Sequence, residues 1–339
     1  MHADDFLIYR GTGEADQKDD PIRRLPPPPP WREFDGEPVT PLDRDAPVGQ
    51  RLQYRTRAVP YQADPGTVTL VNIALHLRRP LLVTGDPGTG KTTLAYAVAH
   101  ELRLGRVLRW PITSRSTSAS GLYHYDAVAR IEEANVRGDG QSEDGYGDIG
   151  RFVRLGPLGT AFAPYDTPRV LLIDEIDKGD IDLPNELLDI FEEGEYRIPE
   201  LQRIADRKPE VEVRPADDGS PVLISDGHVR CREFPFIVMT SNGEREFPPA
   251  FLRRCVQLAL PEPDKRRTQA IVRAQLGDDA AAEADDVIGD FLLRREQGQL
   301  AIDQLLNLVY LLQVAGGDRS LDRDELIDVV LRNLNGPPG

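Results

Sequence analysis

The stretch Leu81–Thr93, LLVTGDPGTGKTT, constrains the fold more than any other part of this 339-residue chain. Three apolar residues precede the glycine-rich segment Gly85–Thr92, and a helix-forming segment, Leu94–Leu102, follows it. A strand, a tight loop and a helix in this order turn backbone N–H groups towards an anion, and glycines let the backbone approach that anion closely. A chance glycine-rich turn is the alternative, but it does not explain the flanking strand and helix. The pattern predicts a phosphate-binding loop in an α/β fold.

The residues of this loop and of the helix start are the candidate phosphate contacts. They are Gly85, Asp86, Pro87, Gly88, Thr89, Gly90, Lys91, Thr92 and Thr93. Lys91 is expected to reach the β/γ-phosphates of a nucleotide, and the hydroxyl of Thr92 is expected to hold Mg²⁺. The loop alone predicts binding, and hydrolysis needs further groups.

Two apolar strands further along the chain end in polar residues that could supply those groups. Val170–Ile173 runs into Asp174 and Glu175, and Phe236–Met239 runs into Thr240, Ser241 and Asn242. Ligands of parallel sheets bind outside the carboxyl ends of the strands. There Asp174 can join the Mg²⁺ shell, Glu175 can polarise the attacking water, and Asn242 can contact the γ-phosphate or orient that water. An acidic strand end and an ordinary turn are the alternatives.

Arg253 and Arg254 form a further candidate pair, directly before a predicted strand over residues 256–260. A guanidinium at a subunit edge could stabilise the transition state at the nucleotide of a neighbouring copy. Taken alone, such a pair is more typical of a solvated face, so its functional interpretation depends on a family resemblance.

Composition excludes several classes of function. Lys and Arg number 41 against 57 Asp and Glu, a net charge of −16, which argues against sequence-independent nucleic-acid binding. The two cysteines, Cys231 and Cys255, lie in no metal-binding spacing. We find no apolar run of membrane-spanning length and no hydrophobic signal core after Met1, so the sequence predicts a cytoplasmic protein without membrane contact.

The chain separates by composition into three parts. Residues 1–59 are rich in Asp, Arg and Pro, and the run Pro26–Pro30 favours an extended polyproline segment. This arm is expected to lie as a strap over its own or a neighbouring subunit, with a ligand for a proline-binding groove as the alternative. Residues 60–262 carry the α/β pattern, and helical periodicity fills residues 263–339.

Within these parts, the sequence also predicts individual elements. The predicted helices span 67–77, 123–136, 185–193, 268–276, 285–296, 301–313 and 322–334. Strands are predicted over 107–110 and 152–155, a mobile loop over 138–150, a turn over 156–159, and a hairpin from 211–214 and 221–224.

The four polar elements, in this order and before a helical lid, resemble an AAA+ ATPase, most closely of the MoxR family. The segment Gly156-Pro-Leu-Gly159 is similar to the GP-containing segment of that family. The resemblance implies a three-layer α/β/α P-loop domain with a parallel sheet, followed by an all-α lid. It also implies an insert in helix 2 at about 113–165 and a pre-sensor-1 hairpin at about 211–235.

Carried onto this chain residue by residue, the resemblance assigns roles. Gly85–Thr92 is Walker A, Asp174 and Glu175 are Walker B, and Asn242 is sensor 1. Arg254 matches the arginine finger best, with Arg253 close behind. ATP with Mg²⁺ is the implied cofactor, held between subunits of a homo-oligomer, by family expectation a hexamer.

Three features depart from the family pattern. The family reads Asp-Glu-Ile-Asn after its Walker B strand, whereas this chain reads Asp174-Glu-Ile-Asp177. The stretch 299–303, where a sensor-2 base is expected, contains none. The arm with Tyr9-Arg-Gly-Thr-Gly13 is not part of ordinary MoxR proteins; it looks like that of a subfamily found beside von Willebrand A-type partners in bacterial conflict or signalling systems.

The function expected from these features is ATP hydrolysis coupled to chaperone-like remodelling or activation of a partner protein. A nucleotide-gated switch or scaffold with little turnover is one alternative, motivated by the missing sensor-2 base. A GTP- or DNA-directed motor of the McrB type is the other, and the acidic charge argues against its DNA-binding form.

Overall fold

The computed structural model describes residues 6–15, 20–49, 63–137, 149–295, 300 and 302–315. The chain divides into two compact units, one formed by residues 1–84 and 92–258, the other by residues 85–91 and 259–339. Among the described residues, no helix has the length and apolar character needed to cross a bilayer. Predictions for residues 138–148 and for the helix over 322–334 lie outside the described residues.

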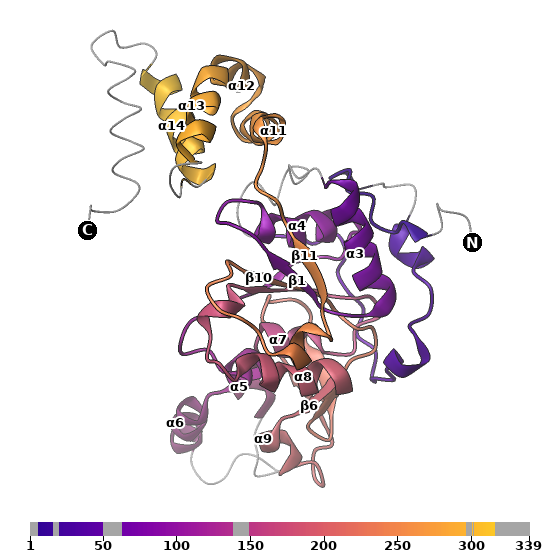
Figure 1. The fold of residues 1–339 in the computed structure, drawn as a ribbon. Helices are drawn as coiled ribbons and strands as arrows, with labels where there is room; N and C mark the ends of the chain where they lie inside the picture. Colours follow the sequence, from indigo (N-terminus) through magenta and orange to yellow (C-terminus); the bar gives the residue numbers. More distant parts are fainter. Residues whose placement is uncertain are drawn as a thin grey trace. The chain divides into compact units, whose positions relative to one another are not determined.

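A five-stranded sheet forms the centre of the first unit, in the order β11-β1-β10-β5-β2 (Figure 1). Its strands are β1 (Leu81–Thr84), β2 (Leu108–Pro111), β5 (Val170–Asp174), β10 (Phe236–Ser241) and β11 (Val256–Ala259). The pairs β1–β10, β10–β5 and β2–β5 are parallel. Every residue of β5 and β10 is buried, as expected for central strands covered by helices on both faces. The predicted parallel α/β fold is confirmed.

Helices flank this sheet and connect its strands. They include α3 (Pro65–Leu77), α4 (Lys91–Glu101) and α8 (Leu183–Glu193), and the short α10 (Pro249–Leu252) precedes β11. The side chain of Asp64 caps α3 by accepting a hydrogen bond from the N–H of Thr67. β1 therefore runs into the glycine-rich loop and α4, in the order that the sequence predicts.

The segment between β2 and β5 differs from its prediction in two places. Residues 123–125 form strand β3 (Tyr123–Tyr125), antiparallel to β4 (Val153–Leu155), and the helix begins only at α6 (Ala127–Arg137) because Asp126 caps it through the N–H of Ala129. The predicted turn at 156–159 is wrong, since Pro157 starts helix α7 (Pro157–Ala161). The remaining elements here are α5 (Ser118–Leu122) and the 3₁₀ turn η3 (Ile149–Phe152).

A second, antiparallel sheet has the order β6-β9-β8-β7. The predicted hairpin is confirmed as β7 (Glu210–Val213) paired with β8 (Val222–Ser225). The sequence did not predict the other two strands, β6 (Glu195–Arg197) and β9 (His228–Arg230), which pair Tyr196 with Val229 from distant parts of the sequence. The short 3₁₀ turn η4 (Ile176–Lys178) and helix α9 (Pro199–Gln202) complete this region.

The described part of the N-terminal arm belongs to the first unit and packs on the rest of it. Its 3₁₀ turns are η1 (Pro21–Arg24) and η2 (Pro30–Arg32). The amide of Asn72 in α3 hydrogen-bonds the backbone of Ile8 and Tyr9, and Phe6 stacks on His76. The N–H of Gly36 donates to the carbonyl of Cys231. Long-range polar contacts thus hold a segment that has little secondary structure of its own.

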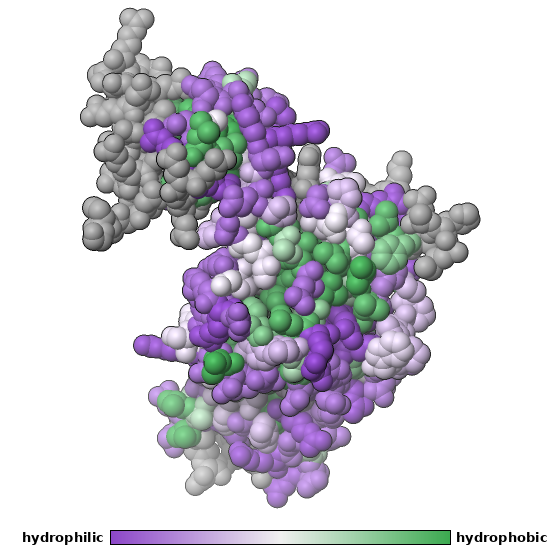
Figure 2. All heavy atoms as spheres, viewed as in Figure 1, coloured by the Kyte–Doolittle hydropathy of each residue, from purple (hydrophilic) through white to green (hydrophobic). Residues whose placement is uncertain are grey.

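The described helices of the second unit form a small apolar core of their own. Some apolar side chains also reach the surface of this unit, as the green atoms in Figure 2 show. They are α11 (Lys265–Leu276), α12 (Asp278–Glu283), α13 (Asp285–Arg295) and α14 (Ile302–Ala315). The helical periodicity predicted α11, α13 and α14, whereas α12 was not predicted because it is only six residues long.

Candidate functional site

The glycine-rich loop leaves β1 and ends in α4. Gly85, Gly88 and Gly90 have φ values of +147°, +81° and +93°, which residues with a Cβ rarely adopt. A Cβ on Gly85 would also lie 2.7 Å from the carbonyl oxygen of Leu260. The ammonium of Lys91, a residue only 8% exposed, donates to the carbonyls of Gly85 and Asp86. The loop therefore curls around the cation that starts the helix.

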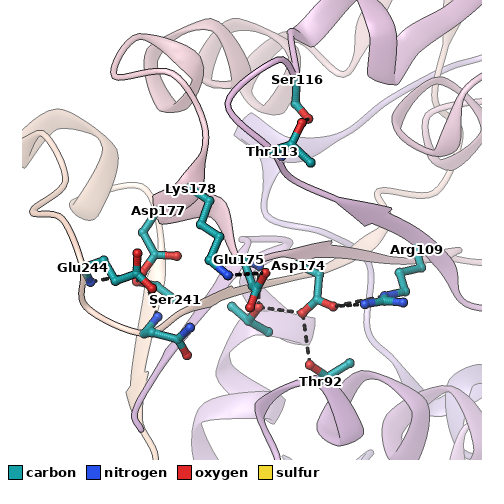
Figure 3. A network of polar contacts seen from close by, with 12 residues as sticks. Thr92, Arg109, Thr113, Ser116, Asp174, Glu175, Asp177, Lys178, Ser241 and Glu244 are labelled. Carbon is teal, nitrogen blue, oxygen red and sulfur yellow. Dashed lines mark hydrogen bonds and ion pairs between the residues drawn. The ribbon is translucent and has the colours of Figure 1, made fainter. Parts of the chain in front are cut away.

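Asp174, at the end of β5, is the centre of the polar network in the first unit (Figure 3). Its Oδ1 accepts hydrogen bonds from the hydroxyls of Thr92, at 3.0 Å, and Thr240, at 2.8 Å. Its Oδ2 accepts from Nε and Nη2 of Arg109, at 3.0 and 2.7 Å. Burial lowers the pKa of Arg109, but the hydrogen bonds to Asp174 and the charge of that carboxylate, with smaller contributions from Tyr96 and Glu175, together raise the pKa above its usual value. Asp174 is 6% exposed, and its Oδ2 forms an ion pair with Arg109.

Glu175, the next residue, has a left-handed backbone with φ +61°, which is uncommon for a residue other than glycine. Its N–H donates to the hydroxyl of Thr240 at 2.8 Å, which ties this conformation to the neighbouring strand β10. Its carboxylate lies 2.9 Å from the ammonium of Lys178, and this hydrogen bond raises the pKa of Lys178. The turn separates the Glu175 carboxylate from that of Asp174 and leaves it partly exposed.

Asp177 fastens the end of β10 to the turn after β5. Its Oδ2 accepts from the hydroxyl of Ser241 and from the N–H groups of Asn242 and Glu244, at 2.9, 2.8 and 3.2 Å. Asp177 is 3% exposed, and its Oδ1 makes no hydrogen bond to the described residues. These hydrogen bonds fix the backbone of Asn242, the residue directly after β10, beside the turn that follows β5. The side chain of Asn242 is half-buried.

Comparison with protein families agrees with this arrangement. Residues 80–255, just over half of the chain, match the model of the AAA domain (dynein-related subfamily). The chain belongs to this AAA family. No curated protein matches the chain.

The candidate residues of this AAA domain lie on or directly after the elements that the sequence predicted for them. Thr92 and Asp174 are hydrogen-bonded, while Glu175 and Asn242 follow adjacent strands. Thr93 lies in the first turn of α4. Arg253 and Arg254 follow α10 directly. The roles of these residues remain predictions.

Three contributors to the site were not predicted, namely Arg109, Thr240 and Lys178. Arg109 is an exposed position of β2, and its partner Asp174 lies 65 residues later in the sequence. No local pattern in the sequence connects these two residues. Thr240 was predicted only as the residue that follows the strand over 236–239, with no role of its own, although it is the fifth residue of β10. A basic residue three positions after Glu175 was the one local signal for Lys178.

The residues present fit Mg²⁺ and a nucleotide phosphate. Magnesium prefers hard oxygen ligands, and the Thr92 hydroxyl and the Asp174 carboxylate offer two such oxygens 3.0 Å apart. A bound metal would supply charge for the phosphates, and Lys91 with the loop N–H groups would hold them. The Glu175 carboxylate makes no hydrogen bond to Thr92 or Lys91, pairs instead with the partly exposed Lys178, and is the group that could accept a proton from water.

Proposed function

We propose that this AAA protein hydrolyses ATP with Mg²⁺ and uses the cycle to remodel or activate a partner protein, as expected of the MoxR group. The observation that carries the proposal is the hydrogen bond between Thr92 and Asp174. It joins the predicted Walker A and Walker B residues across 82 positions of sequence. Glu175 follows Asp174 directly. Its left-handed backbone turns its carboxylate away from that of Asp174, which we expect to bind the metal.

The assembly and its partner are part of the proposal. We propose a homo-oligomer, by family expectation a hexamer, in which Arg254 or Arg253 acts at the nucleotide of the neighbouring copy. A client protein, with a von Willebrand A-type protein as one candidate, would receive the conformational work in the cytoplasm. The net charge of −16 supports a protein client over nucleic acid.

Steady-state turnover tests this proposal. We expect Mg²⁺-dependent release of phosphate from ATP, and a loss of about 100-fold or more in the Glu175→Gln variant because the general base is removed. Binding of ATP should persist in that variant, and a pull-down with the ATP-loaded variant should retain the client. Absence of turnover in the unmodified protein would reject the hydrolytic part.

A second candidate function, a nucleotide-gated switch with little turnover, is favoured by one contact. Arg109 makes two hydrogen bonds to the carboxylate that is expected to serve Mg²⁺, and it neutralises the charge of that carboxylate. Under this second function, Arg109→Gln would raise turnover. Under the first, it would lower turnover by loosening Asp174.

A further inference from the structure

The two neighbouring arginines after α10 have different surroundings. Arg254 donates through Nε to Oε1 of Glu192 at 2.9 Å and through Nη1 to the carbonyl of Ala250 at 3.2 Å. Its side chain is 43% exposed, and within the described residues Nη2 makes no hydrogen bond. Two nitrogens of the guanidinium are thus held by the protein while the third is available to a group outside it.

Among the described residues, Arg253 has long-range contacts only through its backbone. Its carbonyl accepts a hydrogen bond from Nη1 of Arg79 at 3.0 Å. Its exposed guanidinium makes no hydrogen bond or ion pair with the part of the chain that the structure describes. The family resemblance places Arg254 only slightly ahead of Arg253, whereas among the described residues the structure orients the side chain of Arg254 alone.

The residue that orients Arg254 is itself attached to the N-terminal arm. Arg32 of the arm is 6% exposed and donates through Nη1 to the carbonyl of Phe191 at 2.8 Å, next to Glu192 at the end of α8. The guanidinium also lies 3.7 Å from Oε2 of Glu192. A cation at this position complements the partial negative charge of a helix C-terminus. The arm therefore fixes the turn that carries Glu192.

Arg32 has further contacts that keep it in place. Its Nε and Nη2 donate to the carbonyl of Arg78, the C-cap of α3, at 3.2 and 2.7 Å. Its guanidinium lies over the ring of Phe234, 4.5 Å from the centroid. One arm residue thus joins the C-terminal ends of α3 and α8, the second of which presents Glu192 to Arg254.

We propose that Glu192 is a positioning residue for Arg254, and that the arm, through Arg32, holds Glu192 in place. The inference rests on the proposed function, in which Arg254 acts at the nucleotide of a second copy. An exposed ion pair such as Glu192–Arg254 contributes little to folding stability. Its larger effect is on the arginine side chain, which loses rotamer freedom before the neighbouring copy arrives. The seating of the arm then sets how well the arginine is oriented.

Glu192→Gln tests the first link, with Glu193→Gln as its matched control. Glu193 is exposed, its carboxylate makes no hydrogen bond or ion pair with the described residues, and it carries the same charge one position later. We expect Glu192→Gln to lower kcat about tenfold with KM for ATP unchanged. Glu193→Gln should leave both constants unchanged, and the thermal unfolding midpoints of the two variants should agree within a few degrees. An increase of kcat in Glu192→Gln would show that the ion pair inhibits Arg254, which overturns the proposal.

A double-mutant cycle separates positioning from a merely structural role. Arg254→Ala should reduce kcat by about 1,000-fold, and adding Glu192→Gln to it should change nothing further, because Glu192 acts through Arg254. Arg253→Ala, by contrast, should leave the effect of Glu192→Gln intact. Arg32→Lys retains the charge but loses the forked contact, and its effect on kcat should also disappear in the Arg254→Ala background. Additive losses would overturn the proposal.

A second measurement covers the case in which the protein does not turn over ATP. In the Glu175→Gln background, sedimentation velocity with and without ATP measures nucleotide-dependent self-association. Glu192→Gln should weaken that association and Glu193→Gln should not. Turnover in the unmodified protein with equal behaviour of the two variants rejects this inference alone. Absence of turnover rejects the proposed hydrolysis, and if nucleotide-dependent association is absent too, both proposals fall.

Discussion

Two glycine-rich loops with the same Gly-Thr-Gly sequence are found at the two ends of one helix, α4. The loop Gly85–Gly90 precedes Lys91, its first residue, and the arm segment Arg10–Gly13 contacts Glu101, its last. Gly11 and Gly13 have φ of +73°, so both loops use glycine in the left-handed region. They differ in the charge that the helix presents, a cation at one end and an anion at the other.

The arm loop is filled by the anion of its own chain. The carboxylate of Glu101, 4% exposed, accepts hydrogen bonds from the N–H groups of residues 10, 11, 12 and 13 and from the hydroxyl of Thr12, at 2.6 to 3.2 Å. Successive N–H groups that converge in this way form an anion-binding nest. The other loop surrounds Lys91, which fits the phosphate site proposed for it. Similar loop chemistry therefore serves a ligand at one end and the attachment of the arm at the other.

Removing the cation should produce the largest effect, and it should be an effect on binding. We expect Lys91→Met to weaken ATP binding about 100-fold, since charge-assisted hydrogen bonds to phosphate are lost. The free energy of unfolding without nucleotide should change by about 1 kcal/mol or less, because the loop carbonyls can turn to water. Isothermal titration calorimetry and urea unfolding measure the two quantities. A purely structural loss would contradict the proposed ligand role of this loop.

Removing the anion should have the opposite pattern. Glu101→Gln leaves N–H donors facing an amide group, and we expect the free energy of unfolding to fall by about 2 kcal/mol. Affinity for ATP should change by less than about threefold, as the nest holds no ligand from outside. Glu14→Gln is the control, because Glu14 lies in the same arm, is exposed, and its carboxylate makes no hydrogen bond or ion pair with the described residues. Equal stability of the two variants would refute a structural role for the nest.

The sequence predicted the ligand loop but not the arm loop, for a physical reason. Leu81–Thr93 contains its strand, its glycines and its lysine within 13 consecutive positions, so local pattern is enough. The nest needs Glu101, which is 88 positions from Gly13, and no periodicity connects the two. Arg109 with Asp174 and Arg32 with Phe191 are similarly remote pairs.

Buried strands and amphipathic helices were predicted because the pattern that reveals each of them, an apolar run or a helical spacing of apolar residues, lies within one short segment of sequence. Val170–Ile173 and Phe236–Met239 are uninterrupted apolar runs, and both proved to be central strands. Pro157 was predicted in a turn, yet proline is also favoured at the first position of a helix. What the sequence could not supply is which polar group meets which across the fold.

A smaller effect should follow from adding one methyl group to the arm loop. A Cβ on Gly11 would lie 2.7 Å from Cβ of Ala63 and 2.9 Å from a methyl of Val68. Gly11→Ala should therefore reduce the free energy of unfolding by about 1 to 2 kcal/mol, from backbone strain and crowding together. Gly243→Ala isolates the strain, because Gly243 has φ +78° and a Cβ added there would meet no described atom within 4 Å. Equal losses in a urea titration would show that crowding at Gly11 costs nothing.

The smallest effect concerns the pH dependence of the arm end of α4. Burial lowers the pKa of His100, although the adjacent Glu101 opposes this shift. The folded protein then binds fewer protons here than the unfolded chain, whose histidine titrates near 6.5. The contribution of His100 to stability is therefore complete above that pH and declines as pH falls through it, levelling off below the pKa of the folded state.

Urea midpoints at about pH 7.5 and about pH 5.5 should differ less in His100→Gln than in the unmodified protein. In Glu101→Gln the opposing charge is absent, so the decline should extend to lower pH, and a slope unchanged in both variants would place the titration elsewhere in the protein.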